Sequence, residues 1–326
     1  MEKKLLVRFI LILSVILFGI AFLMYSDTDA VPIITTDEAD THSFAVYTGD
    51  GDILYANKMN GIKKSIGGNV VVNTDLFTVN NPIGIIENPP FESILNIYGK
   101  VLKSLNNDKS ILIIYIDGLG YELYKTAIAS GNIPYMASLQ PAAKALTVYP
   151  TITDAAFASM VTGESPKYTG IHSREKKTLP VPSIFDIASE KSKSSKVIEG
   201  NIKIIVDEVP TLLNIDENKN GTIDDEIYNC AMKEIQNPPH ILLVHFHSYD
   251  DFGHKYGPGS KEALNQLGVL DFYIKNIIKK YKGDVIITSD HGMHDVEGNG
   301  EHGYFLSSDL YIPIIEINQA EEAGAL

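Results

Sequence analysis

Apolar runs of five or six residues recur along the chain from Lys109 onward, and segments with helical spacing separate them. The runs lie at 111–116, 202–206, 241–246, 284–288 and 310–315. Continuous apolar runs of this length are typical of strands that are buried on both faces, as in a sheet covered by helices. The pattern therefore predicts an α/β domain over residues 109–326, with a largely parallel central sheet flanked by helices.

The chain before this domain has a different pattern. Residues 43–90 consist of short runs broken by Gly, Asn and Pro, which predicts strands and turns rather than helices. Apolar positions between Phe91 and Leu105 have helical spacing. We predict that residues 31–108 form the end of a polar stalk and then a small strand-rich extension that packs on the main domain. This extension offers no catalytic motif.

The N-terminus carries a strong apolar signal. No charged residue occurs between Phe9 and Tyr25, and three basic residues precede this run, namely Lys3, Lys4 and Arg8. Such a run is about the minimum length for a membrane-spanning helix, and basic residues before it favour a cytoplasmic N-terminus. We predict that residues 1–30 form an uncleaved signal anchor, a single transmembrane helix that holds the main domain outside the cytoplasm at the cell membrane. A cleaved signal peptide is the alternative, although Thr28-Asp-Ala30 matches a cleavage site poorly.

Charge and cysteine content narrow the kinds of ligand that the protein can bind. The 326-residue chain has a formal net charge of −14, so it lacks the basic surface that nucleic-acid polymers require. An acidic protein that handles phosphate esters needs local positive charge, which metal ions could provide. Cys230 is the only cysteine, so an internal disulfide is excluded and a metal site would depend on His and Asp. We interpret Cys230 as a structural apolar residue.

Acidic and histidine side chains follow two of the apolar runs. Asp117 comes directly after 111–116, and Asp290 and His291 come directly after 284–289. Because ligands gather at the carboxyl ends of the strands in such sheets, we expect these side chains at one edge of the sheet. Asp117 taken alone could equally well cap the helix that follows it.

Three further residues complete a candidate metal site. Asp250 lies shortly after the run at 241–246, and His254 shares a face with it if this segment is helical. His302 lies in a glycine-flanked loop, where a lone histidine would usually be exposed. Carboxylate and imidazole ligands from several strand ends are what a pair of zinc-like ions requires. Together with the strand-end residues described above, they predict a two-metal centre.

Thr153 is the candidate nucleophile. It precedes a helical segment at 154–162 that Gly163 closes, and it stands where an N-cap residue belongs. An ordinary capping threonine is therefore the alternative interpretation. The functional interpretation uses the same position, because backbone N–H groups at a helix start can hold a phosphoryl oxygen beside the hydroxyl. A threonine hydroxyl is a weak nucleophile, and coordination to a divalent ion would activate it.

The order of these motifs resembles the alkaline phosphatase superfamily, and most of all its type I phosphodiesterase/nucleotide pyrophosphatase branch. The matching motifs are IDGLG at 116–120, YPTIT at 149–153, VTG at 161–163 with Gly170-Ile171, DDFGHKYGP at 250–258, SDHGM at 289–293 and HGY at 302–304. Jointly they are highly specific and cover about residues 109–315, whereas the extension before residue 109 lies outside the match.

The resemblance implies a metal-dependent phosphoric ester hydrolase with an alkaline-phosphatase-like fold. It implies that one Zn²⁺, or another divalent ion, is held by Asp117, Thr153, Asp290 and His291. It implies a second ion held by Asp250, His254 and His302. Attack by Thr153 on a small phosphate mono- or diester would then give a phospho-threonine intermediate, which water hydrolyses.

Two features depart from the family pattern. Arg174 stands where many diesterases of this branch carry an asparagine, and a guanidinium there could bind the phosphate of a dianionic monoester. Arg174 could instead point outward into a surface ion pair. The interval from His291 to His302 also lacks the long insertion that builds a nucleotide pocket in larger members. Both features weaken the case for a nucleotide substrate.

His245 and His247 flank Phe246 and by alternation share one face of a strand. We predict that His247 contributes to substrate binding. The pair could line the pocket or hold a metal ligand in place from behind. A packed polar strand end is an equally simple interpretation.

Residues 216–227 resemble a calcium loop. Oxygen-bearing side chains occupy its alternate positions, namely Asp216, Asn218, Asn220, Thr222 and Asp224, and a glycine stands at the sixth. Position twelve is Ile227 rather than glutamate, so Asp225 or Glu226 would have to supply the bidentate ligand. A structural Ca²⁺ site and a solvated acidic turn are both open interpretations.

The sequence therefore predicts a membrane-anchored, extracytoplasmic phosphoesterase with two zinc ions that acts through Thr153. A phosphoryl-head-group transferase and a phosphonate hydrolase are alternatives with the same fold. A sulfatase is disfavoured, because no cysteine lies near Thr153 to form the oxidised nucleophile of that family. A non-catalytic binding relative is the alternative of another class, and the intact set of ligands argues against it.

Overall fold

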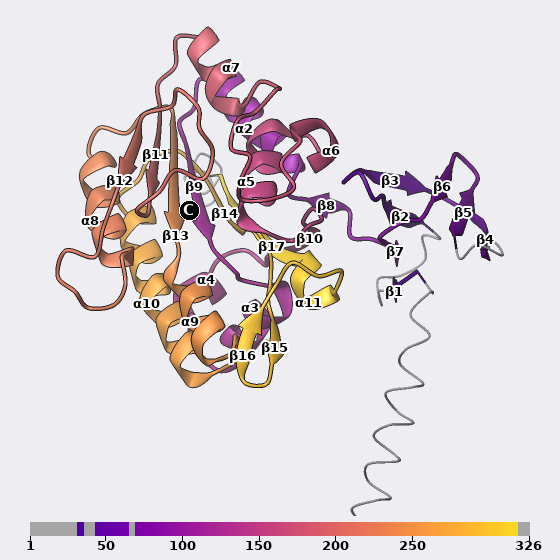
Figure 1. Cartoon of the computed structure of the whole chain (residues 1–326). Coiled ribbons are helices and arrows are strands. Elements are labelled where there is room, and N and C mark those ends of the chain that lie inside the picture. The colour runs from indigo at the N-terminus through magenta and orange to yellow at the C-terminus, as the bar shows by residue number, and fades with distance from the viewer. Residues whose placement is uncertain (1–30, 36–42, 65–68, 319–326) are drawn as a thin grey trace, which may run out of the picture.

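The computed structural model describes residues 31–35, 43–64 and 69–318 (Figure 1). The predicted membrane anchor at 1–30 lies outside these residues. Within the described ranges, no helix has both the length and the apolarity that a membrane span requires.

The larger part of the described chain is an α/β body with a mixed central sheet (Figure 1). In the described ranges this sheet has eight strands, in the order β12 (Thr211–Leu213), β11 (Ser195–Glu199), β13 (Ile241–Phe246), β9 (Ile111–Ile116), β14 (Asp284–Ser289), β17 (Tyr311–Ile317), β10 (Ala143–Leu146) and β8 (Glu92–Ser93). Strand β17 is antiparallel to β14 and β10, and the other neighbours are parallel. The predicted α/β class is confirmed, and the sheet is mixed because β17 is reversed.

Helices cover both faces of this sheet, as the continuous apolar runs predict. Ile113 and Tyr115 of β9 contribute to one core, while Leu112 and Ile114 contribute to the other. The first core includes residues of α2 (Asn96–Asn106), α5 (Thr153–Thr162) and α7 (Ile184–Glu190), and α6 (Pro166–Thr169) packs on α5. The second includes residues of α3 (Tyr121–Ala129), α4 (Pro134–Ala137), α8 (Asp224–Glu234), α9 (Ser248–Tyr256) and α10 (Lys261–Ile278). Every residue of β9, β13 and β14 is buried, so the ends of these strands are held in a rigid frame.

Two of the predicted elements differ from the structure. The run at 202–206 is not a strand, because the chain leaves the sheet after β11 and exposes Ile202 and Val206. The strand in this part of the chain is β11, which ends at Glu199. Its sequence is Ser-Lys-Val-Ile-Glu, so it contains no long apolar run. The predicted helix from Phe91 begins only at Asn96, and Phe91 itself is exposed ahead of the short strand β8.

The N-terminal extension forms two small sheets (Figure 1). One contains β1 (Ile33–Thr35), β7 (Gly84–Glu87), β2 (Phe44–Tyr47) and β3 (Ile53–Ala56), and the other contains β4 (Met59–Lys64), β5 (Val70–Thr74) and β6 (Thr78–Asn80). By contrast, β8 pairs with β10 and α2 packs on α5. The structure therefore groups residues 92–106 with the main sheet, although the sequence pattern placed them in the extension.

The first small sheet packs against the main body through Tyr47. The ring of Tyr47 lies edge-on to Phe305 with the ring centroids 5.1 Å apart, and its hydroxyl donates a 2.9 Å hydrogen bond to the carbonyl of Thr147. Gly84 leaves room for the same phenylalanine, since a Cβ at this position would lie 2.2 Å from the Phe305 ring. The extension thus holds the loop that follows the hairpin of β15 (His294–Val296) and β16 (Asn299–Glu301).

Candidate metal centre and active site

The register of the central strands places three aspartates at one edge of the sheet. Strands β9 and β14 are parallel with Ile116 opposite Ser289, so the next residue on each strand is an aspartate, Asp117 or Asp290. The third, Asp250, lies in α9 just after β13, the other neighbour of β9. A turn at Gly118, with φ 78°, permits this approach, because a Cβ there would lie 2.8 Å from the Asp250 carboxylate.

A first cluster contains Asp117, Thr153, Asp290 and His291. The Thr153 hydroxyl lies 3.5 Å from Asp117 Oδ1 and 3.5 Å from His291 Nε2. The same His291 nitrogen lies 3.3 Å from Asp290 Oδ2 and 3.7 Å from Asp117 Oδ1. All four residues are buried. The structure therefore brings together the four residues that the resemblance assigns to one metal ion.

A second cluster contains Asp250, His254 and His302. Asp250 and His254 are one turn apart on α9, and His254 Nε2 lies 3.3 Å from Asp250 Oδ2. His302 Nε2 lies 4.0 Å from Asp250 Oδ1, and its ring stacks on that of His291 with centroids 3.8 Å apart. This stacking joins the two clusters into one site.

The three imidazoles of these clusters share one orientation. Each Nδ1 faces a backbone carbonyl, which can only accept a hydrogen bond: His254 bonds to Gly300 at 2.7 Å, His302 to Thr151 at 2.8 Å, and His291 to Gly292 at 3.1 Å. Each Nδ1 thereby keeps its proton, and each Nε2 faces the acidic residues of the site. Imidazoles that ligate metals are commonly fixed in this way.

The donor set fits divalent ions for a second reason. Asp250 Oδ1 and Asp290 Oδ2 are buried carboxylate oxygens without a hydrogen-bond partner among the described residues. Unpaired buried carboxylate oxygens are costly unless a cation meets them. Oxygen and imidazole donors together suit Zn²⁺ and related ions. The two clusters therefore have the composition and the unsatisfied atoms of a metal centre.

Thr153 does not cap its helix. The N-cap of α5 is Ile152 in extended conformation, without a side-chain capping bond, and Thr153 is the first helical residue. The alternative interpretation of Thr153 as a capping residue is therefore not observed, and the hydroxyl instead faces Asp117 and His291. The predicted end of the helix agrees, since Gly163 adopts the left-handed conformation with φ 72°. The first-turn N–H groups of α5 remain close to this hydroxyl.

Electrostatics separates the two acids of the first cluster. Burial and the neighbouring Asp117 raise the pKa of Asp290 to about 7. Burial disfavours ionisation of Asp117 too, but the imidazoles of His245 and His247 hold the pKa of Asp117 well below its ordinary value. Asp117 is therefore ionised at neutral pH, whereas Asp290 still holds a proton part of the time. A bound cation would favour the ionised form of both carboxylates.

The pKa values of the two histidines in the second cluster are also shifted in opposite directions. Burial and the adjacent His291 lower the pKa of His302 to about 4. The hydrogen bond to Asp250 raises the pKa of His254 to about 9. His302 is consequently a neutral imidazole at pH 7, which is the form that binds metals.

A cavity of about 580 Å³ opens onto the site. Thr153 and Asp250 lie at its base, and Arg174 and Lys177 contribute positive charge to its wall. Arg174 is exposed, so it reaches the cavity without being enclosed in it. The cavity is large enough for a phosphate ester with a modest organic group.

Sequence reasoning missed several residues of this cavity. Asp154, Lys177 and Asn201 line it, and Asp154 pairs with Lys177 at 3.5 Å. Asp154 follows the candidate nucleophile directly, and that adjacency was a usable signal. Asn201 and the buried Glu199 could not be found, because they lie at the end of β11, which the apolar pattern did not reveal.

Two carboxylates organise the loop at 216–227, and Asp216 accepts hydrogen bonds from the backbone N–H groups of Asn220 and Gly221. Asp225 accepts hydrogen bonds from Asn218 and Asn220, at 2.6 and 3.1 Å. Asp224 was predicted as a calcium ligand, but its side chain is buried elsewhere and accepts hydrogen bonds from the backbone N–H groups of His247 and Ser248. It caps α9 instead of facing the loop. Asp225 thus has the place of the missing acidic ligand, and calcium binding here stays a prediction.

The α/β body thus carries two joined carboxylate–imidazole clusters and a threonine at a helix start, which brings together the residues that the sequence motifs indicated. A family model described as type I phosphodiesterase/nucleotide pyrophosphatase matches residues 111–208 and 188–321, which is more than half of the chain. The chain belongs to this family, as its motifs predicted.

The curated relatives match this chain only over short segments. GPI ethanolamine phosphate transferase 3, catalytic subunit, of Homo sapiens is 34% identical over 65 residues, which make up 19% of this chain and 6% of that protein. GPI ethanolamine phosphate transferase 1 of Gibberella zeae is 33% identical over 98 residues, or 28% of this chain and 9% of that protein. The chain thus spans less than a tenth of the length of these curated relatives.

The solved structures that are similar to this chain share little sequence identity with it. Phosphonoacetate hydrolase from Sinorhizobium meliloti 1021 has a TM-score of 0.48 at 18% identity and covers 59% of both chains. Murine ectonucleotide pyrophosphatase/phosphodiesterase 5 has a TM-score of 0.47 at 18% identity and covers 58% of both chains.

Proposed function

We propose that this protein hydrolyses small phosphate esters with Thr153 as nucleophile and two Zn²⁺ ions, or similar divalent ions, as cofactors. The carrying observation is the position of the Thr153 hydroxyl. It is buried, free of any capping bond, and 3.5 Å from both Asp117 Oδ1 and His291 Nε2. A threonine in an ordinary structural role would cap its helix or pack among apolar groups.

The residues divide the work as follows. One ion would be held by Asp117, Thr153, Asp290 and His291, and another by Asp250, His254 and His302. When bound, the ions would favour the ionised threonine hydroxyl and neutralise charge on the leaving oxygen. Both clusters border one cavity, so an ester phosphorus beside Thr153 has the second cluster close to its leaving group.

Two displacements at phosphorus complete the reaction. The Thr153 oxygen forms a bond to phosphorus while the ester P–O bond breaks, the hydroxyl proton leaves to solvent, and the departing ester oxygen takes up a proton from solvent. This step yields a phospho-threonine and an alcohol. Water then attacks the same phosphorus, the Thr153–phosphorus bond breaks, and inorganic phosphate or a phosphomonoester is released as the threonine regains a proton.

Arg174 and Lys177 favour a phosphate monoester over a diester, because a dianion gains more from two nearby cations. The Arg174→Ala protein is expected to lose about tenfold in kcat/KM for p-nitrophenyl phosphate, and much less for bis-p-nitrophenyl phosphate. Lys176→Ala is the matched control, since this exposed neighbour does not line the cavity. Unchanged kcat/KM for both substrates would place Arg174 outside the phosphate pocket, and a preference for the diester would make the protein a phosphodiesterase.

Transfer of a phosphoryl-linked head group to an acceptor other than water is the second candidate. Similarity to two GPI ethanolamine phosphate transferases, although confined to short segments, favours it. The two reactions share the first displacement and differ in what attacks the phospho-threonine. Product analysis with and without an added alcohol such as ethanolamine separates them, because a transferase needs the alcohol for turnover whereas a hydrolase releases free phosphate in water alone.

We further propose that residues 1–30 anchor the protein in the cell membrane with the α/β body outside the cytoplasm. The support is the charge-free run after Lys3, Lys4 and Arg8. The full chain is expected to remain in the membrane fraction at alkaline pH and to be digested by protease added to intact cells. Release of a shortened chain into the medium would indicate a cleaved signal peptide, and protection from the protease would contradict the proposed orientation.

A further inference from the structure

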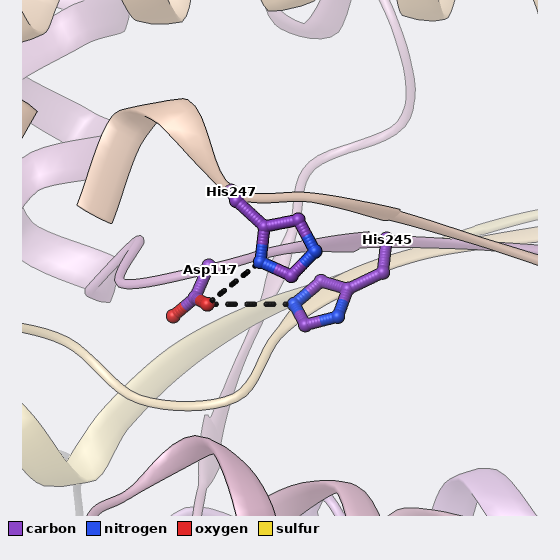
Figure 2. A group of neighbouring side chains, drawn as sticks. All are labelled: Asp117, His245 and His247. Atoms are coloured by element: carbon purple, nitrogen blue, oxygen red, sulfur yellow. Dashed lines mark ion pairs between the residues drawn. The ribbon is translucent and has the colours of Figure 1, made fainter. Parts of the chain in front are cut away.

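A third group of side chains lies behind the first cluster, on the opposite oxygen of Asp117. Asp117 Oδ2 is 3.5 Å from His245 Nε2 and 3.4 Å from His247 Nδ1 (Figure 2). Asp117 Oδ1 instead faces Thr153 and His291. Both imidazoles point toward the same carboxylate (Figure 2). Nothing in the reaction proposed above requires them.

The sheet itself creates this arrangement. Strands β11, β13 and β9 are parallel neighbours, with Ile198 opposite Val244 and Phe246 opposite Ile116. The following positions therefore carry Glu199 beside His245, and His247 beside Asp117. Three adjacent strand ends thus line up carboxylate, imidazoles and carboxylate in a row.

Glu199 fixes both imidazoles from behind. His245 Nδ1 lies 2.9 Å and His247 Nε2 lies 2.6 Å from Glu199 Oε1, and Glu199 is buried. Since a carboxylate accepts, both of these nitrogens carry the proton, and the remaining nitrogen of each ring is directed at Asp117. A carboxylate that orients histidines through their far nitrogens is a recurring support for metal ligands.

The side facing Asp117 is not closed by hydrogen bonds. His245 is completely buried, and its Nε2 has no hydrogen-bond partner among the described residues. Separations of 3.4 and 3.5 Å are longer than the roughly 2.7–3.2 Å of an N–H···O bond. They agree with the spacing of about 3.3–3.4 Å that follows for two ligand atoms on a tetrahedral Zn²⁺ with bonds of about 2.0–2.1 Å.

We propose that Asp117, His245 and His247 form a third divalent-cation site, selective for Zn²⁺-like ions, which Asp117 joins to the first cluster by bridging. Two imidazoles and one carboxylate favour Zn²⁺ over Mg²⁺ or Ca²⁺. His247 and Asp117 line the cavity, and the His247 side chain is 17% exposed, so an ion has a route into the site. With three protein ligands, one coordination position is left for water or a substrate oxygen.

The sequence analysis predicted that His247 binds substrate. As a ligand of a third ion, His247 would instead act through the metal. The third site also gives the ring contacts of His245 a purpose. Tyr115 lies edge-on to His245 at 4.9 Å and Phe157 lies 6.4 Å away, both measured between centroids. These rings hold His245 in a dry, fixed position, as a ligand of a stable site requires.

Zinc stoichiometry of the full chain tests this site. The protein is stripped with a chelator, given excess Ca²⁺ to occupy the loop at 216–227, and reloaded with Zn²⁺ before equivalents are counted by mass spectrometry of the metal. The His247→Ala protein is expected to bind one equivalent fewer than wild type. His294→Ala is the matched control, since His294 is also partly exposed, at 18%, is hydrogen-bonded to Asp309 and is not among the proposed ligands. Equal zinc content in wild type and His247→Ala would overturn the proposal.

A second variant covers the case in which His247→Ala fails to fold. Glu199→Gln keeps the shape of the side chain but removes its charge, and it is expected to weaken binding of one zinc equivalent by about 10–100-fold. Unchanged affinity of every equivalent would overturn the proposal. Replacing Zn²⁺ by Co²⁺ adds an optical readout, in which the variant lacks one set of tetrahedral absorption bands. Ion uptake is measured without turnover, so the result is independent of whether Thr153 is the nucleophile.

Discussion

The Thr153→Ala protein is expected to lose phosphate-ester hydrolysis by a factor on the order of 10⁴ in kcat. The methyl group that remains cannot form the bond to phosphorus, and a water molecule in its place is not held between Asp117 and His291. Zinc content should stay close to that of wild type, because the carboxylate and imidazole ligands of both clusters are intact. The measurement is initial-rate hydrolysis of p-nitrophenyl phosphate together with metal analysis of the same samples.

Thr153→Ser is the matched control for this experiment. It keeps the hydroxyl and loses only a methyl group, so it should retain activity within about tenfold of wild type. Acid quenching during turnover should also leave a phosphoryl group on the peptide that contains residue 153 in wild type. Turnover that survives in the alanine protein would eliminate Thr153 as nucleophile, and absence of Thr153-dependent turnover on every ester would favour a binding relative.

Removal of divalent ions is expected to abolish turnover and to lower the Tm of the folded protein. An ion that binds only the folded state contributes about 2.7 kcal/mol at 100 times its Kd, which corresponds to a Tm difference of roughly 5 °C or more. The Tm difference between zinc-loaded and chelator-treated protein should be larger at pH 8.5 than at pH 6.5.

Two buried groups explain why this Tm difference should increase with pH. In the metal-free protein, the pKa of Asp290 is raised to about 7 and that of His245 to about 9. Burial raises the first, and for His245 the Glu199 carboxylate outweighs the opposing effect of burial. Folded-state pKa values above the unfolded ones mean that stability is lost as pH rises through about 7 and 9. Ions replace these protons, so loaded protein escapes the loss.

Asp290→Asn tests the assignment directly. The neutral side chain cannot titrate, so the metal-free variant should lose less stability than wild type as pH rises toward 7. It should also bind zinc more weakly, because a ligand is gone. Asp295→Asn, an exposed aspartate on the β15–β16 hairpin, is the control and should behave as wild type. A Tm unaffected by chelation at both pH values would contradict a resident metal in this site.

Sequence pattern predicted the site well where the chemistry lies at the ends of apolar strands. Asp117 and Asp290 could be located because β9 and β14 are buried on both faces and leave an uninterrupted apolar record. Asp250 and His254 were expected to share a helical face, and α9 provides it. Periodicity and strand-end position are local properties, so they are legible in one sequence.

The misses come from properties that neighbouring strands and loops decide. Strand β11 lies next to the edge of the sheet and has only two apolar residues, Val197 and Ile198, so the sequence pattern predicted a strand at the exposed run 202–206 instead. Glu199 was lost with it. Asp224 matched a ligand position by spacing, yet the start of α9 captured its carboxylate. The Asp224 carboxylate could face either the loop or the start of α9, and tertiary packing decides between them. A sequence pattern does not reveal that choice.

The contact of Tyr47 and Gly84 with Phe305 makes the N-terminal sheet part of the catalytic architecture, although it supplies no ligand. Phe305 lies three residues after His302, and Thr147, which Tyr47 binds, donates its own hydroxyl to the carbonyl of Asp290. A shortened chain that begins at the α/β body would keep all seven ligands proposed for the two-ion centre and lose the contacts that brace two of them. Substitutions where the extension meets the body are therefore expected to change metal affinity, although they lie outside the set of ligands.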